Sequence, residues 1–428
     1  MVGLRTLHIG NTTPQTDLLQ TALMRAGFAV EPDGVFGTKT QTAVRRFQIS
    51  RGLVSDGIVG NSTWRALRPY LTGYVSHRVS RSDTFFKIAA AHGSTVGAIE
   101  TANPTLVPTA LELGSTVIVP LWFDVVPTNI RQSSTLNSFI AEGLSKRYPF
   151  FTMSIIGKSV TGSDLTAVSI GRGSNHVFYN AAHHANEWIT TTLLWKFAEE
   201  YAIAYATGGQ LFGIDASSLY SKSMLHLVPM VNPDGVDLVT GELFSGTYYN
   251  NAHTIANFFP FLPFPNGWKA NISGIDLNLQ YPAGWELARE FKFSQGFTRP
   301  APRDYVGSRP IETPEARAVF DFTLAHEFSL TLSYHTQGEV IFWKYGEVDP
   351  PQALEIGNVF ARLSGYSLEL TPPGSANAGY KDWFVLHFKL PSYTIEAGLG
   401  TSPLPIEQFE KIYRDNRGIL TIGLIITA

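Results

Sequence analysis

Short apolar runs alternate with amphipathic segments from residue 123 to the end of the chain. Residues 176–182 and 223–232 form apolar runs of the length of buried strands. Residues 193–202 and 314–326 instead repeat their apolar positions at helical spacing. Strands that alternate with helices predict a mostly parallel sheet covered on both faces. We therefore expect an α/β domain with a mixed, mostly parallel twisted sheet flanked by helices.

The first 72 residues have a different pattern, which contains an internal repeat. Residues 33–45 match residues 56–68, and each copy is a Gly-containing turn followed by Thr or Ser and an amphipathic helix. A third helix is expected over residues 17–27. The pattern predicts a small three-helix domain over residues 1–72.

Residues 73–121 form a third pattern. A short strand begins at Tyr74, two helices with polar starts follow, and an apolar strand over residues 116–120 closes the unit. We expect a small βααβ domain, and a large domain over residues 122–428.

Composition agrees with this division. A chain of 428 residues is too long for one ordinary core. With 44% hydrophobic and 16% charged residues it has a globular composition, and it contains no cysteine. The net charge of −3 gives no basic footprint for nucleic acid. No apolar run is long enough to span a membrane.

Polar side chains follow three of the predicted strands. His184 and Glu187 come after the run 176–182, His335 ends the strand that begins near residue 329, and Glu396 ends the next strand. In open α/β sheets the chemistry gathers beyond the carboxyl ends of strands. Two imidazoles and one carboxylate make a catalytic zinc site, and Glu396 is left to act as a base.

Two other histidines have simpler interpretations. The side chain of His183 should point away from that of His184 if the strand continues, so we expect it to be structural or to support a ligand. His226 lies inside an apolar run and is expected in the core.

The N-terminal patterns resemble two known modules. The repeated turn and helix are similar to the peptidoglycan-binding domain of bacterial wall hydrolases. Asp83-Thr84, Ala102-Asn103-Pro104 and the ending over residues 114–120 resemble a LysM domain. The resemblance implies binding to peptidoglycan glycan strands.

Residues 123–428 resemble the zinc carboxypeptidase family of carboxypeptidase A. The matching segments include residues 231–235, 274–278, 312–315 and 382–383. The resemblance implies one zinc ion per chain with His184, Glu187 and His335 as its ligands and Glu396 as the general base. It also implies that Asp276 accepts a hydrogen bond from His184, and that Lys269 replaces an arginine that polarises the scissile carbonyl.

Departures from the family pattern concern the substrate. Family carboxypeptidases hold the C-terminal carboxylate of their substrate with an Asn-Arg pair, which here reads Asn278-Leu279. The family's mobile tyrosine is also missing, although Tyr380 is close in sequence. Asn278 and Tyr380 are therefore candidate substrate-binding residues. Lys381 occupies the specificity-pocket position, where a cation suits an acidic group. Further candidate cations for substrate carboxylates are Arg303 and Arg309.

The missing clamp and the wall-binding modules point to the bacterial γ-D-glutamyl-L-diamino acid endopeptidases, which cut peptidoglycan stem peptides next to meso-diaminopimelate. A conventional metallocarboxypeptidase and a non-catalytic wall-binding protein are the alternatives. We expect a cell-wall or extracellular location in a bacterium. Because residues 1–10 show no signal peptide pattern, a sporulation-associated or cytoplasmic role stays open.

Overall fold

The computed structural model describes residues 3–428, which form two compact units. One unit comprises the chain up to Ile130 together with Thr135–Thr152. The other comprises Arg131–Ser134 and Met153–Ala428. Each unit is described by itself.

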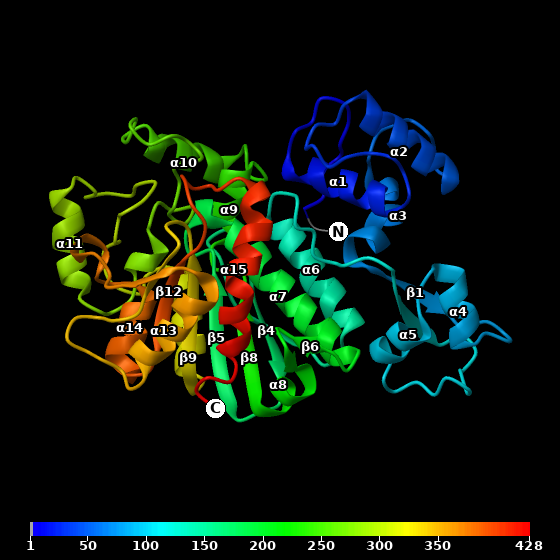
Figure 1. Cartoon of the computed structure of the whole chain (residues 1–428). Coiled ribbons are helices and arrows are strands. Elements are labelled where there is room, and N and C mark those ends of the chain that lie inside the picture. Colours follow the sequence, from blue (N-terminus) through cyan, green and yellow to red (C-terminus); the bar gives the residue numbers. More distant parts are fainter. Residues whose placement is uncertain (1–2) are drawn as a thin grey trace. The chain divides into compact units, whose positions relative to one another are not determined.

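The first unit begins with the expected three helices, α1 (Pro14–Arg25), α2 (Thr38–Ser50) and α3 (Asn61–Thr72) (Figure 1). Their apolar faces bury Leu19, Phe47 and Trp64. Since α1 packs on both α2 and α3, a small common core results.

The sequence repeat has a structural counterpart in two buried glutamines. Gln20 Nε2 donates to Asp33 Oδ1 at 2.6 Å and to the Val35 carbonyl at 3.1 Å, and Gln20 Oε1 accepts from Gly34 N. Gln48 makes the same set of bonds to the second turn, with Asp56, Ile58 and Gly57. Each amide therefore satisfies the backbone of one repeated turn from the preceding helix.

The expected βααβ module follows. Its elements are β1 (Tyr74–Arg78), α4 (Phe85–His92), α5 (Val96–Ala102) and β2 (Thr116–Pro120). Strands β1 and β2 pair antiparallel. Thr84 and Thr95 cap the two helices, since each hydroxyl accepts a bond from a backbone N–H in the first turn.

Helix α6 (Ser134–Arg147), which the expected boundary at residue 122 assigns to the large domain, packs almost entirely within the first unit. Gly143 lies so close to α3 that a Cβ there would be 2.2 Å from the Thr72 carbonyl oxygen. Arg147 Nη1 donates to the Phe123 carbonyl at 2.6 Å. These contacts tie the helix to residues that precede it.

The second unit is built on an eight-stranded sheet with the order β11-β10-β12-β9-β5-β8-β4-β3. The strands are β3 (Thr152–Lys158), β4 (Asp164–Gly171), β5 (Asn175–Ala181), β8 (Ser223–Val228), β9 (Phe328–His335), β10 (Val340–Phe342), β11 (Ser367–Glu369) and β12 (Ser392–Glu396). The four central strands β12, β9, β5 and β8 are parallel, whereas β10 and β4 run antiparallel to their inner neighbours. This mixed sheet confirms the predicted α/β class.

Helices cover both faces of the sheet. The helices of this unit are α7 (Ile189–Ala206), α8 (Ala216–Lys222), α9 (Pro233–Thr240), α10 (Thr247–Ala256), α11 (Trp285–Ser294), α12 (Pro314–Leu324), α13 (Ala353–Ser364), α14 (Tyr380–Phe388) and α15 (Phe409–Ile422). Short 3₁₀ turns are η1 (Ala185–Glu187), η2 (Leu277–Leu279), η3 (Pro373–Ser375) and η4 (Ile406–Gln408), and a small hairpin pairs β6 (Gln210–Leu211) with β7 (Ile214–Asp215).

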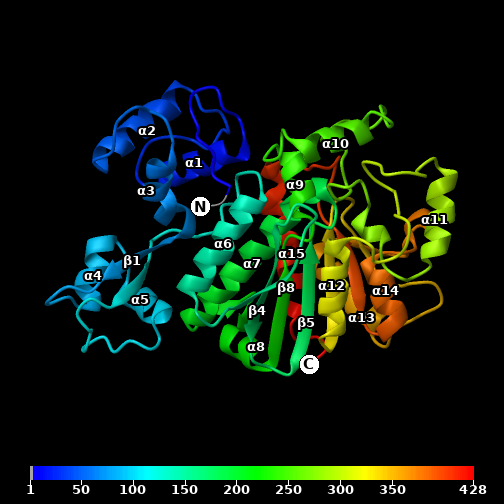
Figure 2. The same ribbon diagram turned by 180° about the vertical axis from the view of Figure 1, so that it is seen from behind.

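Alternation along β5 shows how the two faces are filled. Phe178 packs in a cluster with residues of α12 and α14, whereas the hydroxyl of its neighbour Tyr179 donates to the Leu420 carbonyl of α15. Helices α7 and α15 cross the face seen in Figure 1, and α12 covers the opposite face, seen in Figure 2. Within residues 3–428, no helix has the length and apolar character that a bilayer span requires.

Candidate metal centre and active site

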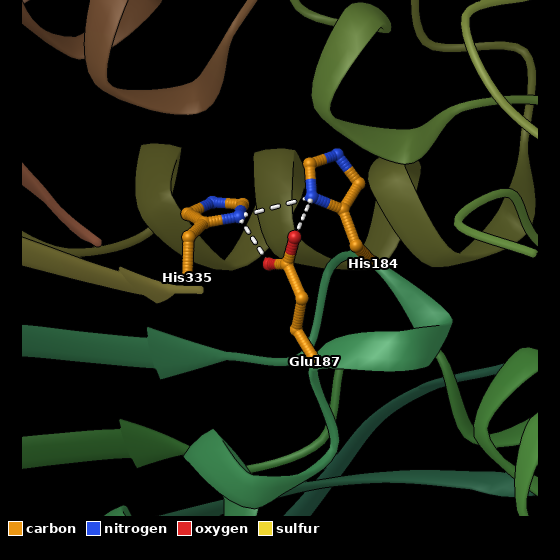
Figure 3. A group of neighbouring side chains, drawn as sticks. All are labelled: His184, Glu187 and His335. Carbon is orange, nitrogen blue, oxygen red and sulfur yellow. Dashed lines mark hydrogen bonds and ion pairs between the residues drawn. The ribbon is translucent and has the colours of Figure 1, made fainter. Parts of the chain in front are cut away.

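The three predicted zinc ligands converge at the ends of two central strands (Figure 3). His184 precedes η1, Glu187 is the last residue of η1, and His335 is the last residue of β9. His184 Nδ1 lies 2.9 Å from Glu187 Oε1, and His335 Nδ1 lies 2.8 Å from Glu187 Oε2. The two Nδ1 atoms are 3.1 Å apart.

This group fits a zinc ion. Ligand atoms about 2.0 Å from a tetrahedral zinc ion lie roughly 3.3 Å from one another, close to the spacings here. Two imidazoles and a carboxylate are the ligand set of many catalytic zinc sites, which keep a fourth position open. Among residues 3–428, no other group of three His, Asp or Glu side chains converges in this way.

The backbone around His184 is fixed by several contacts. Ala182 adopts a left-handed φ of 53° where the chain turns out of β5. The amide of Asn232 donates to the His183 carbonyl at 3.1 Å and to the Ala270 carbonyl at 3.0 Å. Because Ala185 N also donates to the Lys269 carbonyl at 3.0 Å, the ligand loop and the Lys269 loop are held together.

Asp276 supports the first ligand, as the resemblance implies. Its Oδ1 lies 3.1 Å from His184 Nε2 and accepts a bond from Asn278 N, while its Oδ2 accepts from Asp304 N. Burial by itself would raise the pKa of Asp276, but His184 and these bonds hold it below its usual value. The two carboxylates around His184 likewise outweigh burial and raise the pKa of that imidazole to about 9.

Lys269 lies beside the predicted metal ligands. Its Nζ is 2.9 Å from Glu187 Oε1, and its side chain is 18% exposed. Burial alone would lower the pKa of Lys269, but the charge of Glu187 outweighs it and raises the pKa. The ammonium group is therefore a fixed positive charge next to the metal position.

Glu396 ends β12 directly opposite His335 of β9 in the parallel register. It lines a cavity of about 420 Å³, together with His184, Lys269 and Asp276. Its carboxylate makes no hydrogen bond to any residue that the structure describes, and burial raises its pKa. A carboxylate with a raised pKa at the edge of a cavity suits a general base.

Further charged groups line the same cavity. Arg303 Nε and Lys292 Nζ both lie 2.6 Å from the Asp304 carboxylate. The other two nitrogens of Arg303 have no partner within the described part of the chain, so they are available to a substrate carboxylate. Lys381 also lines the cavity, but its Nζ is already paired with Asp382 Oδ1 at 2.5 Å.

Two of the predicted substrate-binding residues do not line this cavity. Tyr380 is fully buried, and its hydroxyl bonds to Thr323 at 3.1 Å because its ring points into the core beneath α14. Arg309 lies on an exposed loop outside the cavity. Asn278 does line the cavity, although its Oδ1 accepts a bond from Tyr380 N.

His183 and His226, which were not expected to bind the metal, lie where the sequence predicted. His183 is buried, its Nε2 is 2.9 Å from the Tyr281 hydroxyl, and burial lowers its pKa well below the usual value. His226 lies in β8 beside Ser169 and His176.

Sequence reasoning missed four residues that shape the site, namely Asn232, Lys292, Asp304 and Asp382. Asn232 and Asp382 lie in segments that resemble the zinc carboxypeptidase family, so the sequence marked these residues but did not indicate what they do. Nothing in the sequence pairs Lys292 with Asp304, since a turn between them brings the two together.

Comparison with known proteins identifies the family. The model of the zinc carboxypeptidase family matches residues 138–418. The chain belongs to the zinc carboxypeptidase family. Models of a putative peptidoglycan binding domain and of the LysM domain match residues 12–67 and 77–120. The large domain is therefore that of a zinc metallopeptidase, with zinc as its cofactor, and two modules associated with the cell wall precede it.

Two relatives each match about two thirds of this chain. Gamma-D-glutamyl-L-diamino acid endopeptidase 1 of Lysinibacillus sphaericus is 41% identical over 290 residues, which are 66% of this chain and 69% of the relative. The uncharacterized protein YqgT of Bacillus subtilis (strain 168) is 37% identical over 276 residues, 64% of this chain and 72% of the relative.

Solved structures agree on the fold. Thrombin activatable fibrinolysis inhibitor superimposes with a TM-score of 0.53 at 16% identity, covering 83% of this chain and 98% of that chain. Carboxypeptidase A from Helicoverpa armigera gives a TM-score of 0.51 at 17% identity, with 90% and 86% covered. The carboxypeptidase fold is confirmed.

Proposed function

We propose that this zinc metallopeptidase hydrolyses the bond between γ-D-glutamate and a diamino acid, such as meso-diaminopimelate, in peptidoglycan stem peptides. The named relative from Lysinibacillus sphaericus, 41% identical, supports this activity. The two N-terminal modules support peptidoglycan as the polymer on which it acts.

The main structural support for this proposal is the presence of Leu279 in the cavity wall. This residue lines the cavity at the position where family carboxypeptidases have an arginine that holds the substrate's terminal carboxylate. It is 8% exposed and packs with Trp285 and Val306. A leucine cannot form a bidentate clamp, so removal of an ordinary C-terminal residue loses its main anchor.

The chain's own residues supply the catalytic groups. His184, Glu187 and His335 would hold zinc, and Asp276 would orient His184 by accepting its Nε2–H. When bound, zinc lowers the pKa of water and stabilises negative charge on the scissile carbonyl oxygen. Glu396 takes the proton of the attacking water and passes it to the leaving amine of the diamino acid.

Lys269 holds the oxygen on which negative charge develops in the transition state. Its ammonium group lies beside the predicted metal ligand Glu187, and the negative charge of Glu187 keeps it protonated. A fixed charge of this kind is effective because it needs no rearrangement during the reaction. Arg303, with two unpartnered nitrogens, is the best-placed cation for a carboxylate elsewhere on the stem peptide.

The wall modules would keep the enzyme near its substrate. We propose the division 1–72, 73–121 and 122–428, with the first two domains binding the glycan polymer and the third cutting its stem peptides. Attachment raises the effective concentration of the catalytic site at the wall.

The test is mass spectrometry of products from defined muropeptides, with the zinc-loaded protein and with the Glu396→Gln variant. We expect cleavage after γ-D-glutamate by the native protein, and none by Glu396→Gln although the variant retains zinc. Substrates with free and blocked C-termini should be cut alike. Release of only the last residue, and only from free C-termini, would show a conventional carboxypeptidase instead.

A further inference from the structure

One wall of the cavity carries a buried ion pair formed by neighbours in sequence. Lys381 and Asp382 both line the cavity, and each side chain is 3% exposed. Lys381 Nζ lies 2.5 Å from Asp382 Oδ1 and donates to the Lys344 carbonyl at 2.7 Å. Asp382 Oδ2 accepts from Gly379 N at 3.3 Å.

Neither ion has its full set of hydrogen bonds. An ammonium group has three donors, and Lys381 donates one hydrogen bond, to the Lys344 carbonyl. Asp382 Oδ1 faces this ammonium but has no hydrogen-bond partner among the residues that the structure describes. Because burying two ions is expensive, a pair placed at a cavity wall with bonds to spare points to a polar group on the ligand.

The carbonyl that holds Lys381 lies further along the chain than the part of β10 that is opposite Glu396. On β10, Val340 is opposite Glu396 and Phe342 is opposite Thr394 in the antiparallel register. Lys344, whose carbonyl holds Lys381, comes two residues after Phe342 in the same direction.

Apolar walls lie between the two ends. Val340 and Phe342 line the cavity, and Thr394 lies on the same face of β12 as Glu396. Two residues of strand span about 7 Å, and Lys344 lies two further residues along the chain, so the catalytic carboxylate and the ion pair are separated by a stretch that suits a methylene chain.

Diaminopimelate has the matching shape. Its side chain is a methylene chain that ends in a carbon bearing both an ammonium and a carboxylate group. We propose that Lys381 binds this carboxylate and Asp382 binds this ammonium, so that the pair selects a diamino acid with a zwitterionic end. The inference rests on the proposed function and assigns the diamino-acid pocket.

The pair distinguishes two kinds of stem peptide. A lysine residue in the same pocket has the terminal ammonium but no carboxylate, so Lys381 would face a like charge without compensation. An amidated diaminopimelate likewise loses the anion that Lys381 requires. A cation alone would leave the ammonium group of diaminopimelate without a partner and would repel the ammonium group of lysine. The Lys381–Asp382 pair offers a partner to both charges of diaminopimelate, so it favours the zwitterion.

The experiment measures kcat/KM for three γ-D-glutamyl substrates that differ only in the third residue: meso-diaminopimelate, its amidated form and L-lysine. The native protein should prefer diaminopimelate by about 30-fold or more, the usual effect of an unpaired buried charge. Lys381→Met should lose this preference. Lys344→Met is the matched control, because the carbonyl that it contributes belongs to the backbone, and it should keep the preference.

A second variant guards against misfolding. Lys381→Met leaves Asp382 unpaired, so the double variant Lys381→Met with Asp382→Asn removes both charges and keeps an acceptor for Gly379 N. It should also lose the preference. If either folded variant still prefers diaminopimelate to lysine as the native protein does, the pair is only structural and the inference is overturned.

Binding separates this inference from the proposed function. In the Glu396→Gln background, dissociation constants for the same three peptides report the pocket without cleavage. If the native protein cuts none of them, the proposed function fails. The dissociation constants for the diaminopimelate and lysine peptides, compared with and without Lys381→Met, then still decide whether the pair recognises the zwitterion.

Discussion

Asp276→Asn is the most informative test of how the metal centre is held. The Asp276 carboxylate accepts three hydrogen bonds of 3.1 Å, from His184 Nε2 and Asn278 N at Oδ1 and from Asp304 N at Oδ2. Asparagine has the same shape, but one of its two acceptors becomes a donor.

Neither orientation of the new amide satisfies this site. With its oxygen toward His184, its NH₂ group meets the backbone N–H of Asp304. In the flipped orientation the NH₂ group meets Asn278 N–H and His184. One unsatisfied buried donor costs about 1–3 kcal/mol of stability. Loss of a carboxylate that orients a ligand histidine typically weakens metal binding about 10- to 100-fold, or roughly 1.4–2.7 kcal/mol.

Zinc affinity is measured by competition with a chromogenic chelator, and stability by denaturant unfolding of the zinc-free proteins. Asp321→Asn, on the exposed side of α12, is the control for the same chemical change and should behave as the native protein. A folded Asp276→Asn protein whose zinc dissociation constant stays within about twofold of the native value would falsify the reasoning.

Four further outcomes are expected. Lys269→Met should lower kcat about 100- to 1,000-fold, whereas Lys269→Arg, which restores the family residue, should keep most activity in the same assay. Removal of zinc by a chelator should abolish hydrolysis and lower the melting temperature, and added zinc should restore both. Gln20→Leu and Gln48→Leu should each destabilise the first unit by about 1–3 kcal/mol in denaturant unfolding, since each leaves a buried turn N–H, that of Gly34 or Gly57, without a partner. The fragment 1–152 should sediment with insoluble peptidoglycan, and a fragment that stays in the supernatant would exclude an anchoring role.

The sequence was sufficient to predict the metal-binding end of the sheet. A parallel strand brings its last residue to a defined edge, so His335 and Glu396 had to lie side by side once both were assigned to strand ends. The turn after β5 then needed only to carry His184 and Glu187 back toward that edge. Position along a strand determines position in space, and the resemblance to the zinc carboxypeptidase family indicated which of these residues bind the metal.

Residues on turns and helix starts were less predictable. Tyr380 was a candidate because it is close in sequence to the place of the family's tyrosine, but at the start of α14 its ring packs against Phe178 and Trp383. Arg309 fell on a loop whose direction no periodicity reveals. Lys381 lines the cavity, but its pairing with Asp382 depends on how α14 begins, and the sequence alone did not show it.

The loss of the family clamp and the charges of this cavity have to be understood together. Lys269, Lys292, Arg303 and Lys381 already line the cavity, and each is paired with a carboxylate from this chain. An arginine in place of Leu279 would add a fifth cation without a partner, within a cluster that includes Trp285 and Val306. The leucine at this position therefore fits a cavity whose positive charges lie on its other walls. His335 and Glu396 lie on strand ends, where the sheet fixes them, whereas Leu279 and Lys381 lie on η2 and at the start of α14.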